Sequence, residues 1–126
     1  YQFSLDVPKA PQGSFDHDAA VRGKALFDNQ AKCATCHRDN LLASSRTILH
    51  SAAEIGIDDF ESQRSPTGKY RTTPLAGLSA ARSKGGYYHD GRFPQLIDVV
   101  NHYNDFMSLH LSTKQKQDLV EYLKSL

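Results

Sequence analysis

Five consecutive residues, Cys33-Ala34-Thr35-Cys36-His37, constrain this chain more than any other feature of its sequence. The Cys-x-x-Cys-His pattern is the attachment signature for a c-type haem. Two thiols one helical turn apart can add across the two vinyl groups of one porphyrin edge, and the adjoining imidazole can ligate the iron. The chain contains 2 cysteines, so one haem would use both. The motif therefore predicts one covalent haem c, attached through Cys33 and Cys36, with His37 as the proximal iron ligand.

Other uses of closely spaced cysteines compete with haem attachment. Cys33 and Cys36 could form a disulfide or a thioredoxin-like redox pair, but the redox pair belongs in a βαβ context that the neighbouring sequence does not show. A zinc site would need a second pair of ligands at close spacing. The other histidines are scattered and provide no such pair: His17, His50, His89, His102 and His110. Haem attachment is therefore the favoured interpretation.

The composition agrees with a small domain built around a large prosthetic group. At 126 residues the chain has the length of one domain. Hydrophobic residues make up 39%, which is low for a chain that builds its own core, and a porphyrin would supply an apolar core element. The formal net charge of +1 gives no basis for binding nucleic acid or an anionic membrane surface. No apolar run approaches the ~20 residues of a membrane-spanning helix.

The cellular location is inferred from the haem. The sequence begins at Tyr1 without a recognisable signal peptide, which suits a mature, processed form. Covalent c-type haem is attached outside the cytoplasm. We therefore expect that an export signal has been removed and that the protein resides in a bacterial periplasm or an equivalent compartment.

The chain divides into a short arm and one domain. Residues 1–15 contain prolines and little periodicity, and they predict an extended arm. The arm either packs on the body through Phe3 and Leu5 or leads in from a membrane anchor or another domain. Residues 16–126 form the predicted domain. Its first helix is expected to begin at a cap near Asp16, because apolar residues then recur at three-to-four spacing.

A glycine inside this first helix indicates how the helix packs. Gly23 and Phe27 are four residues apart and share one helical face. A glycine there would let another helix approach closely, with Phe27 beside the contact. The alternative is that Gly23 has no packing role and only weakens the helix, by ~1 kcal/mol relative to alanine.

The rest of the domain has two further clear helices. Residues 38–73 are polar and irregular, and predict a short helix at 52–55 or 58–62, a turn at 65–68 and a short ribbon. A longer helix is expected to begin with Pro94 in its first turn. One face of that helix carries Leu96, Val99, Val100, Tyr103 and Met107. The last helix is predicted over 113–125, with Ser112 as its cap and an apolar stripe at Leu119, Val120 and Leu123.

Two segments carry a family resemblance. Gly23-Lys24-Ala25-Leu26-Phe27, followed by the Cys-x-x-Cys-His motif, resembles the N-terminal half of c-type cytochromes. The stretch from Tyr70-Arg71-Thr72-Thr73-Pro74-Leu75 to Tyr87-Tyr88-His89-Asp90-Gly91 resembles the haem domain of the bacterial di-haem cytochrome c peroxidase family. That family has Arg-Thr-Pro-x-Leu leading into Tyr-x-His-Asp-Gly and a helix, although the Arg-Asn that usually follows the leucine is Ala76-Gly77 here. With the last helix, the resemblance covers roughly residues 16–126.

The resemblance implies an all-α, cytochrome c-like fold. The first and last helices would cross around one covalently bound haem, and long irregular loops would connect the remaining elements. Phe27, beside the predicted crossing, would then be among the residues that contact the haem.

The ligand on the other side of the iron is left open, with Met107 as the leading candidate and Tyr103 as the alternative. Met107 is the only methionine and lies shortly before the last helix, where c-type cytochromes usually place a methionine ligand; otherwise it fills the core. In the family alignment, counted from His89, the methionine position falls on Tyr103, and some members have tyrosine there. His102, His110, His89 or an open site are the remaining alternatives.

The resemblance also implies residues around the haem. His89 is expected near a propionate or on the distal side of the iron, unless it is a turn histidine bonded to local backbone. Arg71 and Arg92 could pair with the propionates, because a guanidinium matches a carboxylate bidentately, or could simply be solvated.

The leading functional prediction is a periplasmic monohaem cytochrome that carries single electrons and meets redox partner proteins transiently. Such a carrier needs no catalytic residue. The alternative is a peroxidase-like or small-ligand-activating haem protein with an open or tyrosine-ligated sixth site and His89 as base. The peroxidases of the resembled family use two haems, whereas this chain has one attachment motif. A third possibility is a sensor or redox subunit of a larger complex.

Overall fold

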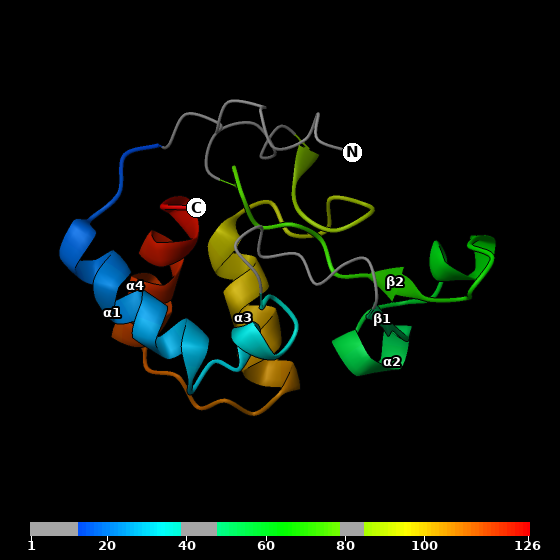
Figure 1. The fold of residues 1–126 in the computed structure, drawn as a ribbon, viewed down its shortest axis with the longest axis horizontal. Coiled ribbons are helices and arrows are strands. Elements are labelled where there is room, and N and C mark those ends of the chain that lie inside the picture. Colours follow the sequence, from blue (N-terminus) through cyan, green and yellow to red (C-terminus); the bar gives the residue numbers. More distant parts are fainter. Residues whose placement is uncertain (1–12, 39–47, 79–84) are drawn as a thin grey trace.

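The structure, a computed structural model, describes residues 13–38, 48–78 and 85–126. Within these ranges the α-helices are α1 (His17–Asp28), α2 (Ala52–Ile55), α3 (Leu96–Phe106) and α4 (Thr113–Lys124), with 3₁₀ turns η2 (Cys33–Thr35) and η3 (Ser62–Arg64). Strands β1 (Leu49–His50) and β2 (Tyr70–Arg71) form an antiparallel ribbon. Helices α1 and α4 lie side by side, α3 lies next to them, and α2 with the ribbon lies to the other side of α3 (Figure 1). The predicted all-α fold with a short ribbon is confirmed.

Local side-chain caps begin the two outer helices where the sequence predicts. The Asp16 carboxylate accepts a hydrogen bond from the backbone N–H of Ala19 at 2.9 Å and begins α1. At α4 the Ser112 hydroxyl accepts from the Gln115 N–H, and the Gln115 side chain accepts from the Ser112 N–H at 2.8 Å. These reciprocal bonds satisfy N–H groups that lack a partner inside the helix.

Helix α3 begins later than predicted. Gln95 is its N-cap, and the Asp98 carboxylate accepts from the Gln95 N–H at 2.9 Å. Pro94 therefore precedes the cap instead of occupying the first turn, so that detail of the prediction is wrong. The helix begins after Gln95 because the Asp98 carboxylate binds the Gln95 N–H, whereas Pro94 has no N–H group that a capping side chain could bind.

The central segment folds into one of the two arrangements predicted for it. A reciprocal Ser51–Glu54 capping box forms the short helix α2, which ends at Gly56. No α-helix covers 58–62, where the described chain instead enters η3. The predicted turn is present, with the Gly68 N–H donating to the Ser65 carbonyl at 3.2 Å.

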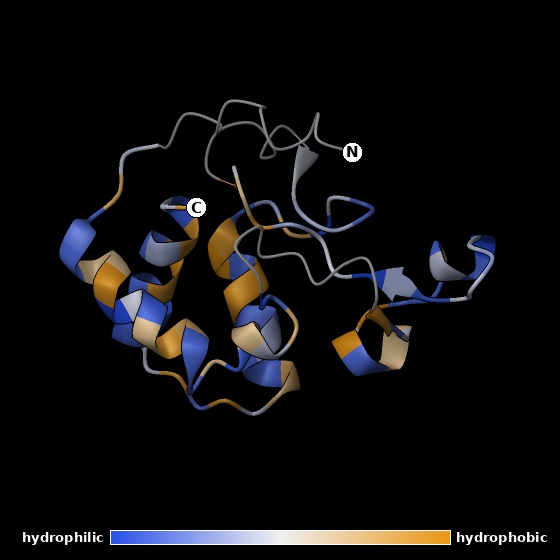
Figure 2. Cartoon of the chain, viewed as in Figure 1, coloured by the Kyte–Doolittle hydropathy of each residue, from blue (hydrophilic) through white to orange (hydrophobic). Residues whose placement is uncertain are grey.

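The core forms where α1, α3 and α4 meet. Phe27 is 1% exposed and packs edge-on against Tyr122, with ring centroids 5.2 Å apart. Apolar and hydrophilic residues alternate around α1, as expected for a helix with one buried face (Figure 2). The buried cluster consists of Ala20, Phe27, Ala31, Leu78, Leu96, Val100, Leu109, Leu111, Leu119, Val120, Tyr122 and Leu123. The stripe predicted on the last helix is thus confirmed.

Gly23 is the point of closest approach between α1 and α4. A Cβ atom placed on Gly23 would lie 2.0 Å from the backbone oxygen of Asp118 and 2.8 Å from Cβ of Tyr122. The predicted packing role of Gly23 is therefore confirmed, because no larger residue fits without separating the helices.

An ion pair joins the same two helices. The Arg22 guanidinium donates to both carboxylate oxygens of Asp118, at 2.9 and 2.8 Å, and Lys114 lies 3.4 Å from one of them. Asp118 is 5% exposed. The hydrogen bonds from Arg22 hold the pKa of the Asp118 carboxyl below its ordinary value. The charged carboxylate is therefore the form that the folded state prefers.

Asp118→Asn is expected to destabilise the protein at neutral pH by about 1–2 kcal/mol, since one charge-assisted bond is lost while Arg22 is half exposed to solvent. A carboxyl with a lowered folded pKa stabilises above its unfolded pKa of about 4, and this contribution disappears as the pH falls through the folded value. The difference between variant and parent, measured by urea unfolding, should therefore shrink towards acid pH. The exposed pair Lys24–Asp28 provides the control, and Asp28→Asn should change stability by less than about 0.5 kcal/mol. A pH-independent difference for Asp118→Asn would contradict the ionic contribution.

None of the helices among the described residues has the length and apolar character needed to span a bilayer. Phe3 and Leu5, which were expected to anchor the arm, lie outside the described residues. The division into an arm at 1–15 and a domain at 16–126 stays a prediction.

Candidate haem site

The two cysteines lie on one tight turn directly after α1. Cys33 begins η2, and its carbonyl accepts from the N–H groups of Cys36 at 3.2 Å and His37 at 3.0 Å. Lys32, at φ 56°, makes the sharp bend that leads into this turn. Both thiols are free and half-buried. The backbone therefore already presents the two thiols and the imidazole within one turn.

The environment of Cys33 differs from that of a redox-active thiol. Burial raises the pKa of the Cys33 thiol to about 12. Reactive thiols of redox pairs have lowered pKa values, because a neighbouring positive charge or helix terminus stabilises the thiolate. The structure therefore gives no support to the thioredoxin-like alternative.

Part of the motif packs against the apolar core, through Cys33 and Ala34. The rings of Phe27 and His37 lie 6.4 Å apart, so the predicted proximal ligand sits beside the most buried aromatic residue of the described chain. Partly buried residues that pack on the same core include Cys33, Ala34, Leu75, Tyr87, Ile97 and Met107. An apolar macrocycle tethered at the cysteines would therefore meet predominantly apolar surface.

The two predicted sixth ligands occupy the end of α3. Met107 is the C-cap of the helix, donates its N–H to the Tyr103 carbonyl at 2.9 Å and packs against the core. Tyr103 lies one turn earlier, and its phenol is within electrostatic range of both cysteine thiols. Burial raises the pKa of this phenol. The role of Tyr103 as an iron ligand stays a prediction.

A second tyrosine adds a buried polar group beside Tyr103. The rings of Tyr88 and Tyr103 are 6.5 Å apart, and the Tyr88 hydroxyl is buried with no hydrogen-bond partner of normal geometry among the described residues. An unsatisfied buried hydroxyl is costly. Together with the free thiols and the apolar lining, it fits a site that is completed by a bound group such as haem.

The histidines predicted as alternative ligands have other surroundings. Nε2 of His102 is 2.9 Å from the Ile55 carbonyl, to which it donates, and the His102 ring stacks on Phe106 at 5.9 Å. His110 is exposed in a left-handed turn at φ 55°. The structure thus gives His102 a structural contact between α3 and α2.

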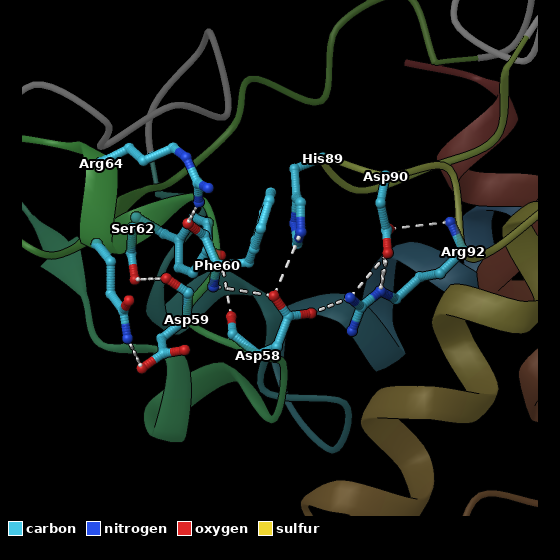
Figure 3. Close-up of polar contacts among 10 residues, drawn as sticks. Asp58, Asp59, Phe60, Ser62, Arg64, His89, Asp90 and Arg92 are labelled. Atoms are coloured by element: carbon cyan, nitrogen blue, oxygen red, sulfur yellow. Dashed lines mark hydrogen bonds and ion pairs between the residues drawn. The ribbon is translucent and has the colours of Figure 1, made fainter.

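His89 and Arg92 belong to a polar cluster that Figure 3 shows. Arg92 pairs with Asp58 and, at 2.8 Å, with Asp90, while Nε2 of His89 lies 3.5 Å from the Asp58 carboxylate. Hydrogen bonds from Arg92 lower the pKa of Asp90 to about 2 and also lower that of Asp58. The His89 ring stacks on Tyr70 at 5.7 Å. The cluster ties the loop at 88–92 to the segment at 58–70.

The structure gives Arg71 and Arg92, the two arginines predicted to pair with the propionates, different surroundings. Arg92 is engaged by two carboxylates of the protein itself. Arg71 is exposed on β2, where it lies opposite Leu49 of β1 in the antiparallel ribbon. The roles of Arg71, His89 and Arg92 towards a haem stay predictions.

Sequence reasoning missed Asp58 and Tyr88. Asp58 is 34 positions from Arg92 in the sequence, and no local pattern announces their pairing. Tyr88 lies between Tyr87 and His89 in a loop flanked by glycines. A second bulky tyrosine in such a glycine-rich loop is the sequence signal that could have marked it as a candidate site residue.

Comparisons with known proteins identify the family of this chain. The family profile of cytochrome c matches residues 20–126. The chain is 27% identical over 138 residues to hydrazine synthase subunit gamma of Kuenenia stuttgartiensis, covering 82% of this chain and 39% of that protein. It is 27% identical over 166 residues to cytochrome-c peroxidase IdrP2 of Pseudomonas sp. strain SCT, covering 98% of this chain and 45% of the relative.

A third relative is the methylamine utilization protein MauG of Methylorubrum extorquens, at 29% identity over 123 residues, or 85% of this chain and 34% of that protein. The chain thus spans less than half the length of each of these curated relatives. No solved structure gives a significant match.

The resemblance to c-type cytochromes related to di-haem peroxidases is thereby confirmed. The chain belongs to the cytochrome c family, whose domains transfer electrons through covalently bound haem c.

Proposed function

We propose that this chain carries single electrons by means of one haem c, attached through Cys33 and Cys36 and ligated by His37. The observation that carries the proposal is the turn at η2, which presents both thiols and the imidazole next to Phe27. The haem, when bound, supplies the Fe(III)/Fe(II) couple.

The side chains of the protein would provide the conditions for rapid electron transfer. Two thioethers at Cys33 and Cys36 would fix the cofactor to the end of α1. Phe27 and Tyr122, packed edge to face, would exclude water from the side of His37 and keep the surroundings apolar. A low-dielectric, rigid pocket lets the protein tune the redox potential through its ligands and burial.

Tyr103 is the better-supported ligand on the opposite side of the iron. Its phenol is within electrostatic range of both thiols, and the ring of a second tyrosine, whose hydroxyl is buried, lies 6.5 Å away. Met107 is four residues further along, at the C-cap, where its packing against the core is also consistent with the alternative of a core residue. We therefore assign the sixth position to Tyr103, with Met107 as the alternative.

A second candidate function is peroxidase-like chemistry. One relative is named a cytochrome-c peroxidase, and a tyrosine-ligated or open site would admit chemistry that a methionine-ligated carrier does not perform. The candidate base is His89, which lies beside Asp58 in the polar cluster. Since the relatives are more than twice as long as the matched part, such an activity could depend on a second domain.

The two functions are distinguished by turnover of hydrogen peroxide with an excess of a reduced dye as electron donor. The haem-loaded chain is expected to undergo a reversible one-electron titration and to show no steady-state peroxide consumption above that of the donor alone. Sustained turnover that is lost in His89→Gln, but retained in the control His17→Gln, which changes an exposed histidine of α1, would replace the carrier by the peroxidase-like enzyme.

We also propose that the protein functions in the periplasm or an equivalent exported compartment and meets its redox partners transiently. The support is the haem attachment itself, which takes place outside the cytoplasm. Fractionation of the native host, followed by haem staining, tests the location.

A further inference from the structure

Tyr88 adopts a backbone conformation that tyrosine rarely adopts. Its φ is +70°, in the left-handed region where a bulky side chain is disfavoured and glycine or asparagine is common. Such outliers persist only where the surrounding structure enforces them, and they cluster at functional sites. A tyrosine at this strained position therefore indicates a role for its side chain.

The surrounding loop enforces the strained conformation. The Tyr87 N–H donates to the Phe93 carbonyl at 2.8 Å, which closes the loop. Inside it, a Cβ on Gly86 would lie 2.4 Å from the Gly91 oxygen, and a Cβ on Gly91 would lie 2.0 Å from the Gly85 oxygen. The backbone is thus too tightly closed for Tyr88 to relax without opening the loop.

The strained residue directs its ring towards α3. The Tyr88 ring packs edge-on against Phe93 at 4.9 Å and against His102 at 5.8 Å, and it faces Tyr103 at 6.5 Å. Its hydroxyl is buried and lacks a hydrogen-bond partner of normal geometry among the described residues. A residue that retains an unsatisfied hydroxyl in a strained position is poorly explained by packing alone, since phenylalanine would pack there without the polar group.

We propose that Tyr88 is a positioning residue whose hydroxyl donates a hydrogen bond to the phenol oxygen of Tyr103 when the haem is bound, and so holds that oxygen in place. This inference rests on the proposed assignment of Tyr103 to the sixth position. It adds a residue at the variable position of the Tyr-x-His-Asp-Gly pattern to the site.

The chemical consequence of this hydrogen bond has a definite direction. A donor that binds the Tyr103 oxygen withdraws electron density from it and weakens it as a donor to ferric iron. Removing the Tyr88 hydroxyl should therefore stabilise the ferric state relative to the ferrous state, and so lower the reduction potential.

The test compares four haem-loaded proteins: the parent, Tyr88→Phe, Tyr103→Phe and the double variant. The readouts are the ferric absorption spectrum and the reduction potential. We expect Tyr103→Phe to change the ferric spectrum, and Tyr88→Phe to change it as well and to lower the potential. In the Tyr103→Phe background the second substitution should have no further effect, because the acceptor is gone.

Matched controls separate the hydrogen bond from the loss of a buried hydroxyl. The neighbouring Tyr87 donates its hydroxyl to the Leu78 carbonyl at 3.4 Å, so Tyr87→Phe removes a comparable group that does not face Tyr103. Tyr87→Phe should leave spectrum and potential unchanged. Met107→Ala should likewise leave the ferric spectrum unchanged.

Three results would overturn the inference. They differ in whether the assignment of Tyr103 or the proposed function fails with it. If Tyr103→Phe alters the spectrum but Tyr88→Phe does not, only the role of Tyr88 fails. The same holds if Tyr88→Phe has the same effect in the Tyr103→Phe background as in the parent. If Met107→Ala alters the spectrum and Tyr103→Phe does not, the tyrosine assignment fails with it, while the electron carrier stands. If the parent chain takes up no haem, the proposed function itself fails.

Discussion

Gly23→Ala is expected to lower the free energy of unfolding by about 3 kcal/mol, the upper part of the range for overpacked cores. The added methyl group would meet the Asp118 carbonyl oxygen at 2.0 Å, and that oxygen belongs to the backbone of α4 and cannot rotate away. The gain of roughly 1 kcal/mol in helix propensity offsets only part of this cost. Urea unfolding of the haem-loaded protein measures the effect.

Gly85→Ala provides the matched control for this substitution. Among the described residues no atom lies within 4 Å of a Cβ placed on Gly85, and its φ is not positive, so the same chemical change should alter stability by less than about 0.5 kcal/mol. If Gly23→Ala were as stable as the parent, the close crossing of α1 and α4 would be refuted.

Replacing both Cys33 and Cys36 by alanine is expected to abolish covalent haem attachment completely, because the chain has no other thiol. The variant should lose all haem on acid–organic extraction, whereas the parent retains it. Loss of the apolar macrocycle should also remove much of the cooperative unfolding transition, because a small domain depends on each large core element. Haem staining after denaturing electrophoresis and thermal unfolding are the measurements.

Thr35→Ala is the control within the motif. Thr35 is exposed, and its hydroxyl donates to the Lys32 carbonyl at 2.6 Å and lies 3.7 Å from Sγ of Cys36. The substitution leaves both thiols in place, so the variant should keep its covalent haem. Haem that stays on the double cysteine variant after denaturation would show that these thiols are not the attachment points.

Local sequence signals predicted those parts of the fold that short-range hydrogen bonds decide. Asp16 caps α1 and Ser112 caps α4 because each side chain reaches an N–H three residues later. Gly23 was recognisable because a glycine in a helix interior has a cost that close packing can offset. The same reasoning misplaced the start of α3, since Pro94 is a known helix-initiating signal whereas glutamine is not a favoured N-cap, and the bond from the Gln95 N–H to Asp98 is seen only in the structure.

Long-range contacts in the site could not be predicted in the same way. Arg92 was expected at a propionate, but Asp58, far away in the sequence, lies next to it in the folded chain. The left-handed conformation of Tyr88 follows from the closure of a loop by Gly86, Gly91 and Phe93, and each residue alone signals only a turn. Tyr103 and Met107 both looked suitable as ligands because they share a helical face, and their different surroundings became visible only in three dimensions.

These contacts indicate how the fold supports the site. His102 on α3 donates to the Ile55 carbonyl at the end of α2, and Gly56 lies directly against the ring of Phe106. The polar cluster of Asp58, His89 and Arg92 connects the same segment to the loop of Tyr88. Segments without extensive secondary structure are thus fixed to α3 from two directions, near Tyr103.

Covalent attachment of one haem c through Cys33 and Cys36 is measured by the reduced spectrum of the denatured protein in alkaline pyridine. This spectrum reports both the amount of haem per chain and whether its vinyl groups have been converted to thioethers. We expect one haem per chain with both vinyl groups converted. A chain that carries no haem, or haem whose vinyl groups are intact and which is removed by acid–organic extraction, would contradict it.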